Sequence, residues 1–289
     1  MIQRRRFLQL CAASAGFGLP VQAAPDWRGQ GLGADVSLTL AGHGDRQAVL
    51  AALPALLARI EGEFSLYDPQ SALSRLNTQG QLHPSPMFEA VMDWALLIWQ
   101  ATDGAFDPTV QTLWESRQTG IPALAAGFDR VRHHDGQITL PPDTRLTFNG
   151  IAQGFAADAV ASLLARHGFD KALIDMGEAR ALKGPWQIGI ADPRYGILAH
   201  RSLTAGAIAT SSPLATLING QPHLMHPRGL PPLWSSVSVE ADRAVLADGF
   251  STAAVFFTRS QLAAMMPRLR GMRQITLIDF DGNLTTLSA

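Results

Sequence analysis

The chain has 289 residues, of which 47% are hydrophobic and 16% are charged, and its formal net charge is −1. Such a balance gives no basic face, so nucleic acid and anionic lipid are not expected partners. The single cysteine, Cys11, lies near the N-terminus, which leaves the rest of the chain without a disulfide, a thiolate nucleophile or a cysteine metal site. The length suffices for one large domain or two closely joined ones, stabilised by burial of a hydrophobic core.

The N-terminus has the pattern of an export signal. The run Arg4-Arg5-Arg6-Phe7-Leu8 fits a twin-arginine motif, and the apolar stretch from Leu8 to Pro20 is too short to span a bilayer. Val21-Gln22-Ala23 resembles a cleavage site. The alternative, an amphipathic first helix, is disfavoured because two glycines and a proline interrupt the stretch.

We therefore expect a twin-arginine signal peptide over residues 1–23 and one folded domain over residues 24–289. The mature protein is expected to be periplasmic. Leu10 stands where a lipobox requires a small residue, so no stable membrane anchor is expected.

Hydrophobic periodicity predicts helices and strands in an irregular order. Apolar residues at helical spacing predict helices over 46–60, 71–77, 87–102, 152–167 and 246–258, with Ser71 as the cap of the second. Short alternating or apolar runs between glycine and proline turns predict strands over 35–40, 172–175, 187–191, 207–210, 235–239 and 275–279. The absence of a regular β-α-β rhythm favours an α+β fold.

The pair Asp248 and Thr252 is the first candidate for chemistry. A spacing of four residues places both side chains on one face of a helix, where two hard oxygen donors suit Mg²⁺ beside a phosphate. The spacing equally permits a structural role. Asp248 would then cap the N-terminus of the following helix, and the Thr252 hydroxyl would bond back to a carbonyl.

Four stretches together carry a family resemblance. They are F-S-L-Y-D-P-Q-S from Phe64, T-D-G-A-F-D-P-T from Thr102, N-G-I-A-Q-G-F-A-A-D from Asn149 and A-D-G-F-S-T-A-A from Ala247. In this order, the chain from about residue 31 to 257 resembles the ApbE family, the FAD:protein FMN transferases. The resemblance implies mixed, largely antiparallel sheets flanked by helices, with a nucleotide cleft between two closely joined halves.

The same resemblance implies an enzyme that uses FAD as substrate and requires Mg²⁺. It would transfer FMN to a Thr or Ser hydroxyl of an exported redox protein that carries a flavinylation motif, and it would release AMP. Asp248, Thr252 and the main-chain carbonyl of Gly150 match the family's metal ligands. Ser251 stands where some members have an additional acidic ligand, so water would take that place here. His223 matches the family's histidine and is the expected proton acceptor or phosphate contact.

The expected nucleotide contacts are also carried over from the family. They are Leu32, Tyr67, Ala105, Phe106, Asp107, Thr147, Gln153 and Leu224. Tyr67 offers an aromatic face and a hydroxyl to a ring system. For Phe106 the alternative is a place in the core, and for Asp107 and the proline after it the alternative is a turn.

Several positions depart from the family pattern. Thr147 stands where Asp is commoner, and Gln153 stands where many members have Lys or Glu. His226 stands where the family has an Asp, three residues after the histidine that His223 matches. Glu178 stands in place of the second of two glycines, and the Gln153 and Glu178 combination resembles that of a twin-arginine branch. If the family's Asp orients His223 or its loop, its loss weakens activity. If His226 only caps the turn, the change from Asp to His alters little. These departures leave open an alternative function, a periplasmic flavin-binding or flavin-carrier protein without transferase activity.

The export signal is tested by replacing Arg4, Arg5 and Arg6 together with lysine. The triple variant should remain in the cytoplasm, because the twin-arginine route reads the arginine pair. Immunoblots of periplasmic and cytoplasmic fractions measure the distribution, with Arg28→Lys as a control outside the signal. Export of the triple variant at the control level would exclude this route.

Overall fold

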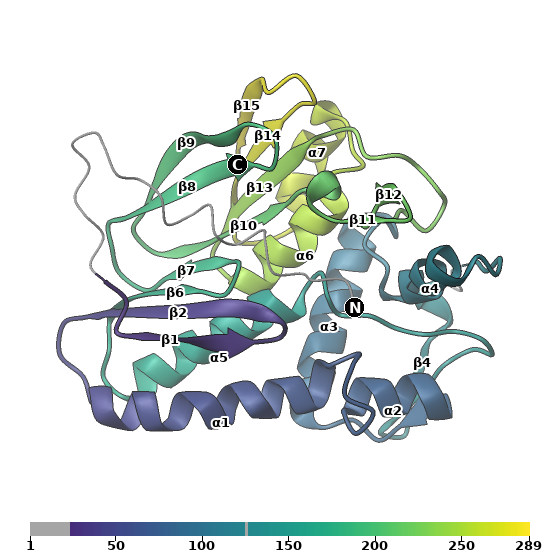
Figure 1. Ribbon diagram of the computed structural model, residues 1–289, viewed down its shortest axis with the longest axis horizontal. Helices are drawn as coiled ribbons and strands as arrows, with labels where there is room; N and C mark the ends of the chain where they lie inside the picture. The colour runs from purple at the N-terminus through teal and green to yellow at the C-terminus, as the bar shows by residue number, and fades with distance from the viewer. Residues whose placement is uncertain (1–23, 125–126) are drawn as a thin grey trace.

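The computed structural model describes residues 24–124 and 127–289, so the expected signal peptide lies outside the described residues. The main element is an eight-stranded sheet in the order β1-β2-β6-β7-β10-β13-β14-β15 (Figure 1). Its strands are β1 (Trp27–Gly31), β2 (Ala34–Ala41), β6 (Lys171–Asp175), β7 (Ala179–Ala181), β10 (Gly206–Ser211), β13 (Ser236–Ala241), β14 (Met272–Ile278) and β15 (Leu284–Ser288). All neighbouring pairs in this sheet are antiparallel.

Three small antiparallel units accompany the main sheet. They are β3 (Gln81–Leu82) with β5 (Gln137–Thr139) and β4 (Arg132–His134), the hairpin of β8 (Trp186–Asp192) and β9 (Gly196–Leu203), and the pair β11 (Leu217–Ile218) and β12 (Gln221–Pro222). The helices are α1 (Arg46–Phe64), α2 (Ala72–Gln79), α3 (Pro86–Ala101), α4 (Gln111–Thr119), α5 (Ala152–Arg166), α6 (Ala244–Ala254) and α7 (Arg259–Met265). The α+β prediction is confirmed.

The helices that position the site are α5 and α6, which pack against each other. In Figure 1, α5 lies between the sheet and the long helix α1, and α6 lies against β10 and β13. Helix α6 is almost completely buried, because ten of its eleven residues are inaccessible to solvent. One continuous hydrophobic core joins these two helices to α1, α3 and the inner face of the sheet.

Neither α5 nor α6 has a capping side chain at its own N-cap position. Each instead takes a carboxylate from the other helix. Asp158 of α5 accepts a hydrogen bond of 3.1 Å from the N–H of Val245, and Asp248 of α6 accepts one of 2.9 Å from the N–H of Gly154. Both donors lie in first helical turns, where N–H groups have no partner within the helix. The two contacts therefore fix α5 and α6 in one relative position.

Close packing accompanies these contacts. A methyl group added at Gly154 would stand 2.3 Å from the carbonyl oxygen of Ala244 and 2.8 Å from Cβ of Asp248. Only glycine therefore allows α5 to approach α6 this closely. Asp158 also forms ion pairs with Arg180 of β7 at 2.8 Å and with Arg243 at 3.3 Å, which tie the helix pair to the sheet.

The predicted helix over 246–258 differs from the observed one. Helix α6 begins at Ala244 and ends at Ala254, and Thr258 starts α7 as the first member of a capping box with Gln261. The predicted range thus merges the end of one helix with the cap of the next. The other predicted helices are present within a few residues, and Ser71 caps α2 as expected. Within residues 24–124 and 127–289, none of the helices combines the length and apolar character that a membrane span requires.

The α5 and α6 contact is tested by Gly154→Ala. The added methyl group meets main-chain atoms, which cannot move aside cheaply, so the free energy of unfolding should fall by about 1–3 kcal/mol. The matched control is Gly62→Ala in α1, where a methyl group meets nothing within 4 Å. That change should raise stability by about 0.5–1 kcal/mol, because alanine is the better helix former. Urea unfolding of both variants checks the pair, and equal stability of the two would contradict the packing argument.

Candidate functional site

Asp248 lies in the middle of α6 and is only 4% exposed. Its carboxylate accepts the Gly154 N–H described above, so it acts as a cap for α5 rather than for its own helix. The structural alternative, in which Asp248 caps the N-terminus of the helix that follows it, is therefore not what the structure shows. Helix α6 begins at Ala244, so Asp248 lies inside it, and the carboxylate instead caps α5 through Gly154, 94 positions earlier.

Thr252 follows Asp248 on the same helical face and brings its hydroxyl to the end of the loop before α5. Thr252 Oγ1 lies 3.4 Å from the carbonyl oxygen of Gly150 and 3.2 Å from the carbonyl oxygen of Asp248. A methyl group at Gly150 would stand 2.8 Å from the same hydroxyl, which explains the small residue there. The structure thus brings together the three residues that the sequence proposes as metal ligands, although the Thr252 hydroxyl also bonds back within its own helix.

Two serines extend this oxygen-rich region to the end of β10. Ser211 Oγ lies 2.8 Å from Ser251 Oγ and 3.5 Å from Thr252 Oγ1, and the Ser251 hydroxyl donates to the carbonyl of Asp248 at 2.9 Å. Ser251 is buried, so its hydroxyl is engaged in holding α6 to β10. Ser211 lies in the run Ala209-Thr210-Ser211-Ser212 and was not among the expected site residues.

Three acidic residues in this region interact electrostatically, since the charges of both Asp248 and Asp175 act on Glu178. Burial raises the pKa of Asp248 to about 7, and the Gly154 N–H offsets part of the rise. Burial also raises the pKa of Glu178 well above its usual value, and the nearby charges of Asp248 and Asp175 add to the rise, while the Thr210 N–H lowers it in part. The pKa of Asp175 is raised by burial and lowered in part by the Gly177 N–H and by Arg28. A cluster of buried acids favours either bound protons or a bound cation.

The oxygen atoms present fit a hard divalent cation. Within the described residues, no three His, Cys, Asp or Glu side chains stand close enough to hold a metal by themselves. A cation here would therefore need the Asp248 carboxylate, the Thr252 hydroxyl and the Gly150 carbonyl together, an all-oxygen set of the kind that Mg²⁺ prefers. A further sign is Glu178 Oε2, a buried carboxylate oxygen without a hydrogen-bond partner in the described part of the chain.

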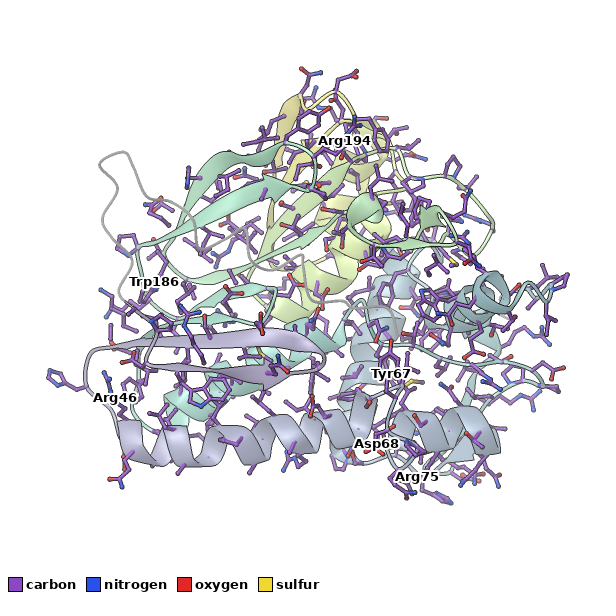
Figure 2. All side chains as sticks on the ribbon, viewed as in Figure 1. Arg46, Tyr67, Asp68, Arg75, Trp186 and Arg194 are labelled. Carbon is purple, nitrogen blue, oxygen red and sulfur yellow. The ribbon has the colours of Figure 1, made fainter. Side chains whose placement is uncertain are left out.

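The expected nucleotide contacts occupy different environments. Tyr67 is 71% exposed on the loop between α1 and α2, where Figure 2 labels it beside Asp68. Leu32 has a φ of 53° in the turn between β1 and β2, and its N–H donates to Glu61 at 2.8 Å. Gln153 is half-buried in the first turn of α5, directly beside Gly154. Thr147 is also half-buried, and its N–H donates to the carbonyl of Pro108 at 2.9 Å.

The segment after α3 faces inward. Ala105 and Phe106 belong to the hydrophobic core. The Asp107 carboxylate accepts from the Thr109 N–H at 2.8 Å and from the Phe128 N–H at 3.2 Å, so it caps a turn. Burial raises the pKa of Asp107, and these hydrogen bonds offset part of the rise. The alternatives weighed for the sequence, a core position for Phe106 and a turn for Asp107, therefore describe these side chains. A nucleotide contact in this segment would come from the backbone.

The histidine segment contains two different imidazoles. His223 is half-buried, and its Nδ1 lies 3.0 Å from the carbonyl of Thr216 and 3.2 Å from that of Pro213. Leu224 packs against the main core. His226 is buried, and its Nδ1 accepts the Arg228 N–H at 3.0 Å. Burial, and secondarily the charge of Arg228, lower the pKa of His226. The His226 imidazole therefore caps its own turn. This is the alternative in which the change from Asp to His alters activity little.

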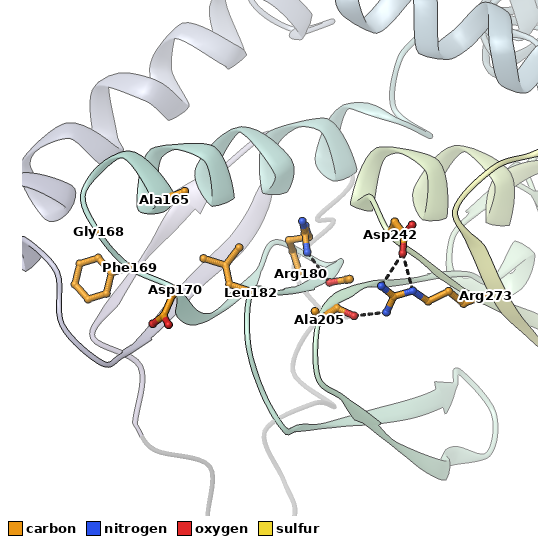
Figure 3. A pocket seen from close by; sticks show the side chains of 10 residues that line it. Ala165, Gly168, Phe169, Asp170, Arg180, Leu182, Ala205, Asp242 and Arg273 are labelled. Carbon is orange, nitrogen blue, oxygen red and sulfur yellow. Dashed lines mark hydrogen bonds and ion pairs between the residues drawn. The ribbon is translucent and has the colours of Figure 1, made fainter.

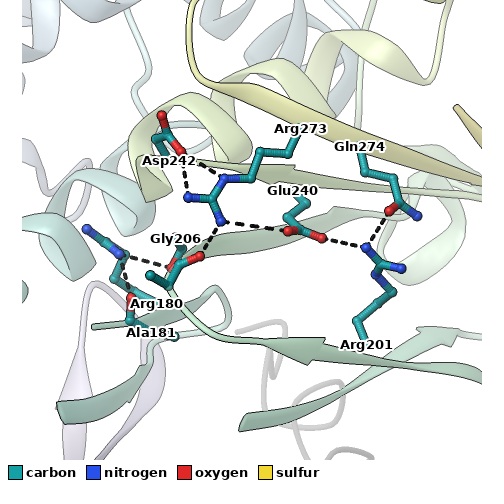
Figure 4. A network of polar contacts seen from close by, with 9 residues as sticks. Arg180, Ala181, Arg201, Gly206, Glu240, Asp242, Arg273 and Gln274 are labelled. Atoms are coloured by element: carbon teal, nitrogen blue, oxygen red, sulfur yellow. Dashed lines mark hydrogen bonds and ion pairs between the residues drawn. The ribbon is translucent and has the colours of Figure 1, made fainter. Parts of the chain in front are cut away.

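A cavity of about 590 Å³ lies elsewhere, between the end of α5 and the start of α6 (Figure 3). None of its lining residues is an expected site residue. Its arginines are already paired: Arg180 Nε binds Asp158 at 2.8 Å, and Arg273 Nε binds Asp242 at 2.8 Å. Figure 4 shows the second of these pairs within a network that continues through Glu240 to Arg201. Because its arginines are neutralised by carboxylates and no expected site residue lines it, this cavity is not the candidate site.

Comparison with protein families and with known proteins identifies the relatives of this chain. The model of the ApbE family matches residues 32–276. The chain belongs to the ApbE family. A FAD:protein FMN transferase from Salmonella typhimurium is 29% identical over 230 residues, which cover 65% of each chain. One from Escherichia coli K12 is 30% identical over 160 residues, or 45% of each chain. The matched region thus spans less than two thirds of these relatives.

Solved structures share the fold over nearly the whole length. The flavin transferase ApbE from Vibrio cholerae superposes with a TM-score of 0.77 at 20% identity and covers 91% of this chain and 96% of its own. An ApbE protein from Thermotoga maritima gives a TM-score of 0.78 at 22% identity, with 90% and 95% covered. These similarities confirm the expected ApbE-type fold.

The buried acids predict a pH dependence of stability in the presence of a chelator. The pKa of Asp248 is about 7 in the folded protein against an ordinary 3.8, so the folded state binds more protons between these values. The contribution of this group to stability is therefore lost as pH rises towards 7. Asp248→Asn removes the titration and keeps an acceptor for the Gly154 N–H. With EDTA at pH 8 it should be more stable than the wild type, by on the order of 2–4 kcal/mol.

Urea unfolding at pH 5 and pH 8 measures this difference. Asp143→Asn is the control, since Asp143 lies on an exposed turn and should leave stability unchanged at both pH values. If Asp248→Asn lowers stability equally at pH 5 and pH 8, the carboxylate is needed as a structural cap and the electrostatic account fails.

Proposed function

We propose that the protein is a FAD:protein FMN transferase that depends on Mg²⁺. It transfers FMN from FAD to a Thr or Ser hydroxyl of an exported redox protein and releases AMP. The family match over residues 32–276 and the names of the relatives support the reaction class. The observation that carries the proposal is the oxygen set of the buried Asp248 and the half-buried Thr252 and Gly150, which the fold assembles from two distant segments.

The chemistry replaces the phosphoanhydride bond of FAD by a phosphoester bond to the acceptor hydroxyl. The acceptor hydroxyl oxygen forms a bond to the FMN phosphorus, the bond from that phosphorus to the bridging oxygen breaks, and AMP leaves with the bridging oxygen. When bound, a divalent cation supplies charge neutralisation and alignment of the pyrophosphate. Asp248, Thr252 and the Gly150 carbonyl would hold it. Their positions are fixed by helices α5 and α6, so little reorganisation is needed on binding.

His223 is proposed to take the proton of the attacking hydroxyl. A carbonyl oxygen can only accept, so the contacts of His223 Nδ1 with Thr216 and Pro213 place the ring hydrogen on Nδ1. This tautomer leaves Nε2 as the nitrogen that can accept a proton. The contact with Pro213 also links His223 to the serine cluster, because Pro213 follows Ser211 by two residues.

Export is part of the same proposal. A twin-arginine substrate crosses the membrane folded, which suits a protein that acquires FAD in the cytoplasm and acts on a periplasmic acceptor. The N-terminal arginine motif supports this localisation. The balanced net charge of −1 is in keeping with a protein acceptor rather than a nucleic acid.

The function is tested by incubating the protein with FAD, Mg²⁺ and a Thr-containing acceptor protein, followed by mass spectrometry. The wild type should add one FMN phosphoryl group to the acceptor and release AMP. His223→Ala should slow transfer by about two orders of magnitude, the usual scale for a positioned base, while FAD binding survives. The matched control is His83→Ala, because His83 is an exposed histidine that also contacts a carbonyl, that of Gly136 at 3.1 Å.

The alternative function has a distinct outcome in this assay. If neither the wild type nor His226→Asp transfers FMN to any acceptor while both bind FAD, the protein is a flavin carrier. If His83→Ala slows transfer as much as His223→Ala, the role assigned to His223 is wrong.

A further inference from the structure

Glu178 has a place in the fold that the expected metal site does not use. It ends the tight turn between β6 and β7, in which the Gly177 N–H donates to Asp175 at 3.1 Å and the Met176 N–H donates to the carbonyl of Glu178 at 3.2 Å. Gly177 adopts a φ of 91°, a conformation that glycine allows. The turn holds Glu178 in a fixed position beside β10, and the Glu178 side chain is only 7% exposed.

The Glu178 carboxylate lacks the partners that a buried charge requires. Its Oε2 atom has no hydrogen-bond partner in the described part of the chain. The nearest arginine in sequence, Arg180, is engaged with Asp158 at 2.8 Å and with the carbonyls of Ala181 and Gly206. A buried, unpaired carboxylate oxygen is costly and is rare in native proteins unless a ligand or ion completes it.

The groups around Glu178 are those of the proposed cation site. Asp248 interacts electrostatically with Glu178, and the Thr210 N–H stabilises the Glu178 carboxylate. The next residue, Ser211, contacts Ser251 and Thr252 through its hydroxyl. Glu178 therefore lies beside β10, within electrostatic reach of Asp248.

We infer that Glu178 is a ligand of the divalent cation, so that this protein holds the ion with two carboxylates, from Glu178 and Asp248. The inference rests on the proposed function, since it requires a cation beside Asp248. A second carboxylate raises the affinity for a divalent ion, because affinity follows the number of charged ligands. It also takes the place of the acidic ligand that Ser251 does not supply, and it explains why a carboxylate oxygen is buried without a partner.

The test is a titration of the purified protein with Mn²⁺ at pH 8, followed by the electron paramagnetic resonance signal of free Mn²⁺. Glu178→Gln should weaken Mn²⁺ binding about tenfold or more, the scale expected when a charged ligand becomes neutral. The matched control is Asp175→Asn, which removes the same charge from a neighbouring carboxylate that is already paired with the Gly177 N–H. This control should weaken binding by less than about threefold if ligation, rather than the general field, is the cause.

Thermal unfolding gives a second readout and shows that the variants fold. In chelator, Glu178→Gln should unfold at a higher temperature than the wild type, because the repulsion from Asp248 is removed, and Mn²⁺ should raise its melting temperature less than that of the wild type. If Glu178→Gln does not fold, Glu178→Asp keeps the charge on a shorter side chain and should also bind Mn²⁺ more weakly.

Three results would overturn the inference. Equal Mn²⁺ affinity in the wild type and Glu178→Gln, with or without a loss of FMN transfer, would mean that Glu178 shares a proton with Asp248 or acts as a base. An equal effect of Asp175→Asn would mean that only the local field matters. If the wild type itself binds no Mn²⁺, the proposed cation fails as well, which distinguishes that failure from a wrong assignment of Glu178 alone.

Discussion

The reciprocal capping of α5 and α6 is the contact on which the rest of the site depends. Asp158 of one helix and Asp248 of the other each accept an N–H group from the first turn of the partner helix. Gly154 lets the helices meet closely enough for both hydrogen bonds to form. The loop that enters α5 is thereby held against α6, and the carbonyl of Gly150 meets the Thr252 hydroxyl without any contribution from a flexible segment.

In this arrangement, two opposing effects act on the charge of the Asp248 carboxylate. The N-terminus of α5 favours a negative charge at Asp248, whereas burial disfavours it, and the pKa of about 7 shows that burial is the larger effect. Glu178 adds a second carboxylate to the same region. A divalent cation would offset this repulsion, so a single bound ion would couple the stability of the helix pair to the chemistry of the proposed reaction.

Several parts of this structure could be predicted from the sequence, because they depend on local signals. The long helices follow apolar periodicity, Ser71 caps α2, and Gly168 follows the end of α5 with a positive φ of 83°. Other parts depend on tertiary contacts. Helix α4 has only one buried residue, so it shows no apolar period, and β7 is only three residues long. The role of Asp248 as a cap for α5 could not be inferred from its own neighbours, since its donor lies 94 positions earlier.

The sequence predicted the residues proposed as metal ligands but not their surroundings. The motif spacing placed Asp248 and Thr252 on one helical face, and the structure joins them to Gly150. Glu178 appeared in the sequence only as a substitution for glycine, because nothing local shows that the turn after β6 brings it within electrostatic reach of Asp248. The most direct measurement of the central claim is the anomalous X-ray signal of Mn²⁺ in crystals grown with FAD. We predict a peak within about 2.0–2.6 Å of oxygens from Asp248, Thr252 and Gly150. A peak remote from these three oxygens, or no peak, would contradict the account.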